Sequence, residues 1–235
     1  MPDLPSSLAL TNISDGSTAT AAPVRNNFSA IQTAVNALIT ALSGGTAGQT
    51  IVYSDADTIA PGSAGALTKI ADTTLGADAA DITFSAIPGT YAHLIVEIYA
   101  RSAKAAIAYD TFHVRFNGDT AANYDSQLGY ATGGTPSAAE TLAGTSGRIG
   151  WVPAATAPAD VFGAAKVTVP HYAGAKQKTA HTQGTSKHGT GSGDIWTTHS
   201  AVFWRSSAVI TSLTILAAGG NLLTGTRVTL YGVSA

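Results

Sequence analysis

The chain has 235 residues, 45% of them hydrophobic and 11% charged, whereas an average soluble domain carries about 25% charged residues; a core can therefore form beneath a weakly charged surface. The formal net charge of −2 provides no basic field for nucleic acid, and no apolar run is long enough to cross a membrane, so we expect neither nucleic-acid binding nor membrane insertion. The absence of cysteine excludes disulfides, thiolate metal sites and cysteine nucleophiles.

The N-terminal part of the chain predicts an arm followed by a helix. Residues 1–23 are rich in Pro, Ser, Thr and Ala without hydrophobic periodicity, which predicts an extended arm that needs a partner surface to become ordered. Over residues 24–43, apolar side chains recur alternately four and three residues apart, the a/d spacing of a coiled coil. Six residues form this seam: Val24, Phe28, Ile31, Val35, Leu38 and Leu42.

This seam is narrower than the apolar stripe of a typical surface helix, and an isolated helix of this length is marginal in water. The helix must therefore pack on something. We expect it to associate with itself and to form a homotrimer. Docking on its own domain or on a neighbouring protein is the alternative, because the run is shorter than three heptads.

The rest of the chain predicts a linker and then a β domain. Residues 44–65 are rich in Gly and Ala and predict a linker, and over residues 66–235 the hydrophobic period becomes two. Many short strands, each with one polar face, favour an antiparallel β-sandwich or jelly roll. Eight runs predict strands: 81–87, 91–101, 111–117, 147–152, 161–169, 195–204, 208–216 and 227–233.

The segments between these runs predict turns and loops. Asn117-Gly118 and Gly133-Gly134 are turn signals. The Gly-, Thr- and Lys-rich run 174–193, which includes His181 and His188, predicts an exposed loop.

Four segments carry a resemblance to a known class of proteins. They are Gly45–Gln49, Ile87–Leu94, Val114–Thr120 with Asn123-Tyr124, and Thr224–Val233. Together they resemble the spacer and C-terminal β domain of tailed-bacteriophage virion fibre proteins, over about residues 45–235. The resemblance implies an appended, trimeric virion protein, leaves its attachment point on tail, baseplate or head open, and brings no catalytic residue with it.

The polar residues show no pattern typical of catalysis or metal binding. The six histidines lack the spacing of a metal motif, and the sparse carboxylates form no pair suited to glycoside hydrolysis. Asp110, Asp119 and Asp125 flank the Asn117-Gly118 turn, where hydrogen bonds to the backbone are the expected role. We therefore expect no enzyme, no metal site and no cofactor.

Two aromatic residues are candidates for receptor contact. Tyr130 and Trp151 lie beside Gly-rich segments, and exposed aromatic faces stack on sugar rings. Trp196 and Trp204 fall on one face of a single predicted strand and are expected in the core.

The sequence thus favours a non-enzymatic, homotrimeric fibre or spike located in the virion. Its arm would bind other proteins of the tail, baseplate or capsid, and its β domain would adsorb to a host-surface glycan. A head fibre or capsid decoration protein is the alternative, and a polysaccharide-degrading tailspike is a third.

Overall fold

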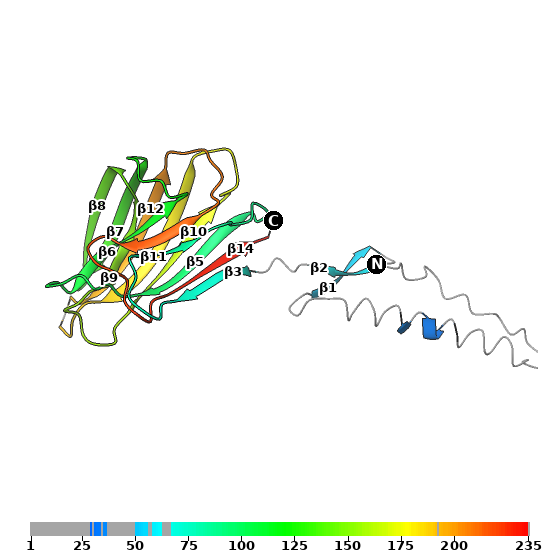
Figure 1. Ribbon diagram of the computed structural model, residues 1–235, viewed down its shortest axis with the longest axis horizontal. Coiled ribbons are helices and arrows are strands. Elements are labelled where there is room, and N and C mark those ends of the chain that lie inside the picture. Colours follow the sequence, from blue (N-terminus) through cyan, green and yellow to red (C-terminus); the bar gives the residue numbers. More distant parts are fainter. Residues whose placement is uncertain are drawn as a thin grey trace, which may run out of the picture. The chain divides into compact units, whose positions relative to one another are not determined.

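The computed structural model describes residues 29, 31–33, 35–36, 50–55, 58–62, 67–191 and 193–234. The chain divides into two compact units, residues 1–64 and residues 65–235 (Figure 1). Fourteen strands lie within these described residues: β1 (Thr50–Asp55), β2 (Thr58–Gly62), β3 (Leu67–Thr74), β4 (Asp81–Phe84), β5 (His93–Ala100), β6 (Tyr109–Phe116), β7 (Tyr124–Thr132), β8 (Thr135–Gly144), β9 (Gly147–Pro153), β10 (Gly163–Pro170), β11 (Lys178–Lys187), β12 (Ile195–Trp204), β13 (Leu213–Ala217) and β14 (Arg227–Val233).

The first unit contains a hairpin and helical residues. Strands β1 and β2 pair antiparallel inside the segment 44–65, so the predicted linker carries secondary structure of its own. Residues 29, 31–33 and 35–36 are helical, within the predicted helix 24–43. The predicted arm and four seam residues (Val24, Phe28, Leu38 and Leu42) lie outside the described residues.

The second unit is an antiparallel β-sandwich, which confirms the predicted fold class for the β domain. Its large sheet has the strand order β3-β14-β5-β10-β11-β12-β7-β8, and its small sheet has the order β4-β13-β6-β9. Each of the eight predicted runs overlaps an observed strand. Strands β3, β7, β8 and β11 were not predicted.

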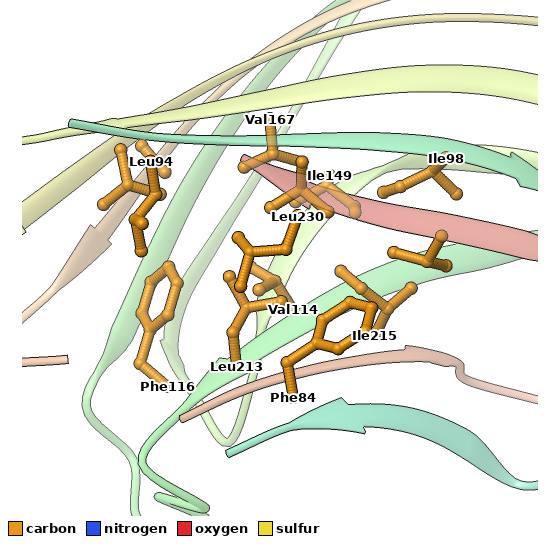
Figure 2. Close-up of a cluster of buried hydrophobic side chains, with 14 of the residues drawn as sticks. Phe84, Leu94, Ile98, Val114, Phe116, Ile149, Val167, Leu213, Ile215 and Leu230 are labelled. Carbon is orange, nitrogen blue, oxygen red and sulfur yellow. The ribbon is translucent and has the colours of Figure 1, made fainter. Parts of the chain in front are cut away.

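The core lies between the two sheets because apolar residues alternate along the strands that face each other. In Figure 2, Val114, Phe116 and Leu213 of the small sheet point toward Leu94 and Leu230 of the large sheet. Trp204 is 2% exposed, as expected for a core residue, and its indole Nε1 donates to Asp119 Oδ2 at 2.7 Å.

Strand β9 is an edge strand of the small sheet, and hydroxyl groups of the large sheet complete its hydrogen bonding. Thr182 Oγ1 donates to the carbonyl of Ile149 at 3.0 Å, and Ser200 Oγ donates to the carbonyl of Arg148 at 2.8 Å. The Arg148 amide in turn donates to Ser126 Oγ at 2.9 Å. An unpaired buried backbone group is costly, so these bonds explain why hydroxyl residues occupy inward positions here.

The exposed loop predicted for 174–193 is wrong. Half of this run is strand β11, which pairs with β10 on one side and with β12 on the other. His181 is exposed, but His188 is 4% exposed, so the two histidines do not share one surface. The backbone ladder on both sides holds this strand although its inward side chains are small or polar.

The strand register defines two ends of the sandwich. At one end, Leu67 pairs with Val233, which pairs with His93. At the other end, Thr74 pairs with Arg227, which pairs with Tyr99 of β5. This row of paired residues continues across the large sheet through Ala164 of β10 and Thr185 of β11. We refer to these as the Leu67 end and the Thr74 end.

Candidate functional site

Tyr130 and Trp151, the two predicted receptor contacts, lie against each other. Their ring centroids are 4.5 Å apart and their planes meet at 64°, in the edge-to-face arrangement that aromatic pairs favour. Tyr130 comes from β7 of the large sheet and Trp151 from β9 of the small sheet. Both side chains are half-buried. The structure thus brings the pair together, and its contact with a receptor stays a prediction.

Three more rings extend this pair into an aromatic cluster made of Tyr109, Tyr130, Trp151, His188 and Trp196. The Trp196 ring lies 4.5 Å from that of His188, 4.8 Å from that of Tyr109 and 5.2 Å from that of Trp151. Trp196 is half-buried and donates from Nε1 to the carbonyl of Gly193 at 3.0 Å. It therefore belongs to this cluster, at the border of the core.

The cluster forms where β9, the edge strand of the small sheet, packs across β11, β12 and β7 of the large sheet. Strand β8 lies beyond β7 at the edge of the large sheet, and every one of its residues is exposed or half-buried. Trp151 from β9 therefore meets Tyr130 and Trp196 from the large sheet near this edge of the sandwich. Trp196 is the second residue of β12 and His188 directly follows β11, which places the cluster at the Thr74 end.

Arg148 adds a cation to the cluster. Its guanidinium carbon lies 4.5 Å from the centre of the Trp151 ring, within the range of a cation–π contact. Its Nε is buried and has no hydrogen-bond partner among the described residues. Burial lowers the pKa of Arg148, and the ring face partly replaces the lost water.

His188 is the buried titratable group of the cluster. Its Nε2 shares a 2.7 Å hydrogen bond with Ser186 Oγ, and its Nδ1 has no partner among the described residues. Burial lowers the pKa of His188 to about 4, against a weaker opposite effect of Asp194. His113 on β6 behaves alike, because burial and the charge of Arg148 lower its pKa to about 4.

These two histidines predict that the sandwich loses stability in mild acid. Between pH 6.5 and about 4 the unfolded chain binds protons that the folded chain does not, so stability falls as pH falls through this window. By pH 4.5 the loss is about 2 kcal/mol for each histidine. The pKa of Asp72 is lowered to about 2, so protonation of this carboxylate reduces stability only at a pH below this window.

Thermal unfolding at pH 7 and pH 4.5 tests this prediction. His188→Gln removes one proton site and is expected to halve the fall in melting temperature, whatever its effect at pH 7. An unchanged fall in the variant would contradict the assignment to His188.

The carboxylates near the Asn117-Gly118 turn have structural roles. Asp119 accepts hydrogen bonds from the Ala121 amide at 2.8 Å and from Asn123 Nδ2 at 2.9 Å. Asp110 and Asp125 also accept from backbone amides, but these amides belong to Thr111, Gly219 and Ala143, so neither carboxylate stabilises the Asn117-Gly118 turn as predicted. In the part of the chain that the structure describes, no group of three or more His, Asp or Glu side chains could hold a metal ion.

The predicted oligomerisation seam is described at two residues. Ile31 and Val35 are helical, four residues apart, and are 42% and 46% exposed. Residues at this spacing lie on the same face of a helix. An exposed apolar pair of this kind supports association and does not identify the partner.

Sequence reasoning missed Tyr109, Arg148 and His188 as members of the aromatic cluster. The alternation of Tyr124, Ser126, Leu128 and Tyr130 was the available signal, because it places Tyr130 on an inward face.

No helix among the described residues is long and apolar enough to span a membrane.

No family model and no curated protein matches the chain. Among solved structures, it is similar to a chain of the T=1 particles derived from infectious bursal virus, with 14% sequence identity and a TM-score of 0.13. The match covers 81% of this chain and 48% of that one, so it spans about half the length of the viral chain. At this TM-score the likeness carries no argument about fold or function.

Proposed function

We propose that this chain is a non-enzymatic structural protein of a tailed-phage virion, a homotrimeric fibre or spike whose β-sandwich adsorbs to the host surface. One observation carries the proposal: the aromatic cluster lies at the Thr74 end, opposite the end where the sandwich begins. Residues 1–66 precede that beginning. A protein anchored through these residues would be joined to the sandwich at the end away from the cluster.

The strand order supports this role. Eight strands form two four-stranded units, β3-β14-β5-β10 and β4-β13-β6-β9, and successive members mostly alternate between the units. We infer a jelly roll, in which two Greek keys face each other, extended by the hairpins β7–β8 and β11–β12. Viral capsid and lectin domains use this architecture, so it suits both assembly and sugar binding.

The exposed pair Ile31 and Val35 supports the trimer. A single chain leaves both side chains in water, and three parallel copies would bury them at a and d positions. A surface with few charges also suits close packing of identical copies.

Deleting residues 1–23 tests the anchoring role. The remaining chain keeps the seam and the sandwich, so we expect a soluble trimer whose incorporation into virions falls at least about tenfold. Immunoblotting of purified particles measures incorporation, with the full-length chain expressed in trans as the control. Normal incorporation of the truncated chain would refute the anchor.

Immunogold labelling of intact particles measures the attachment point. Label on tails or baseplates supports the fibre, whereas label on heads supports the head-fibre or capsid-decoration alternative.

A further inference from the structure

The outer face of the large sheet carries a groove. None of the residues of the aromatic cluster lines it. It has a volume of about 650 Å³ and crosses strands β14, β5, β10 and β11. The groove is largely open to solvent. The short side chain of Ala164 and the backbone of Gly184 form its floor, between longer side chains on both sides.

The register places the side chains that line this groove in rows. In one row, Thr229 pairs with Glu97, Glu97 with Lys166, and Lys166 with Gln183. In the next row, Arg227 pairs with Tyr99, which pairs with Ala164. Neighbouring strands lie about 4.8 Å apart, so each row offers polar groups at regular intervals across the groove.

The central row has unused hydrogen-bonding capacity. Glu97, Lys166 and Gln183 are exposed, and none of their side chains is engaged in a hydrogen bond or ion pair within the described residues. Together they present a carboxylate, an ammonium and a planar amide, which donate and accept hydrogen bonds. A ligand rich in hydroxyl groups matches this mixture, because each hydroxyl both donates and accepts.

Aromatic rings are present at both ends of the groove. Tyr99 is 49% exposed, and Phe162 supports one face of its ring at 4.8 Å and 13°. Tyr231 lies four residues from Arg227 along β14. Such rings offer apolar faces on which the C–H groups of a sugar ring can pack.

The charges of the groove nearly balance. Glu97 opposes Lys166, and Asp72 binds Arg227 through two hydrogen bonds of 3.0 and 2.7 Å. Lys69, beside Tyr231, leaves the groove with a net charge of at most one, too weak a field to attract a phosphate, sulfate or nucleic-acid chain strongly.

We propose that this groove binds a neutral oligosaccharide, with Tyr99 as the ring platform and Glu97, Lys166 and Gln183 as the hydrogen-bonding row. The proposal rests on the proposed adsorption function for its biological source, a host-surface glycan. It adds a contact surface separate from the aromatic cluster.

Titration of the full chain with saccharides tests the proposal. The probes are neutral hexasaccharides of glucose, galactose, mannose and N-acetylglucosamine, with a sulfated hexasaccharide as the charged comparator. We expect at least one neutral probe to bind with a Kd in the range of about 10 μM to 1 mM per site. Gln183→Ala and Ala164→Tyr should each weaken this binding at least about tenfold, by removing a hydrogen-bonding group and by filling the floor.

Gln127→Ala is the matched control, because Gln127 is exposed on β7 of the same sheet and outside the groove. Thermal unfolding checks that each variant is folded. Absence of binding by every neutral probe, preference for the sulfated probe, or equal binding by the groove variants would overturn the proposal. A change in oligomer mass caused by Ala164→Tyr would also overturn the proposal, because it would show that the groove of the unmutated chain contacts a second copy.

These outcomes are independent of the virion assignment. Saccharide binding by a chain that fails to join particles leaves the groove proposal standing and rejects the anchor. Normal incorporation of a chain that binds no saccharide supports the anchor and rejects the groove proposal.

Discussion

Light scattering of the full chain is expected to give a mass about three times 23.6 kDa at micromolar concentration, and Ile31→Asp is expected to reduce it to that of one chain. In a three-stranded seam this substitution places three carboxylates together without partners. Burial of an unpaired charge opposes association strongly, so loss of the trimer should be complete at this concentration.

Gln32→Asp provides the matched control. Gln32 is helical and exposed like its neighbour Ile31, but it lies outside the a/d seam. The same charge at this position should leave the mass unchanged. A full-length chain that is monomeric, or equal dissociation by both variants, would reject the seam and favour docking of the helix on another protein.

Trp151→Ala is expected to reduce adsorption to host cells about tenfold and to destabilise the sandwich by about 2–3 kcal/mol. The ring touches Tyr130, Trp196 and the Arg148 guanidinium, so its removal also leaves a cavity. For a domain of this size the melting temperature should fall by about 5–10 °C. Adsorption is therefore measured well below the melting temperature of the variant.

Two further variants separate binding from folding. Tyr130→Phe keeps the packing of the cluster and removes one hydroxyl, so it reports on contact more than on stability. Phe203→Ala is the control, because Phe203 is 48% exposed on β12 and does not belong to the cluster. Parental adsorption by both cluster variants would end the receptor-contact hypothesis for Tyr130 and Trp151. If Gln183→Ala still lowers adsorption in that case, the groove alone makes the contact.

Some features of this protein are determined by short stretches of its own sequence. The strands of the central core were predicted because one face of each carries large apolar residues at period two, as in Leu94, Val96 and Ile98 of β5. The turns were also readable. Asn117 and Gly118 have φ angles of 53° and 63°, and Gly133 and Gly134 have φ angles of 53° and 84°, a left-handed region that few other residues accept.

Other features arise only from contacts between distant segments. Strand β8 is exposed on both faces, and β11 directs Ala180, Thr182 and Ser186 inward, so neither shows an apolar alternation. Backbone pairing with neighbouring strands holds both in place, and the Thr182 hydroxyl bond to β9 adds to this for β11.

The two surfaces proposed for binding belong to this second kind. Tyr130 and Trp151 are 21 positions apart in the sequence and meet because β7 and β9 come from facing sheets. Glu97, Lys166 and Gln183 form a row because three strands pair in one register. Local sequence fixes which face of a strand is apolar, since that depends on alternation alone. Which strands become neighbours depends on the free energy of the whole sandwich, and the sites depend on those neighbours.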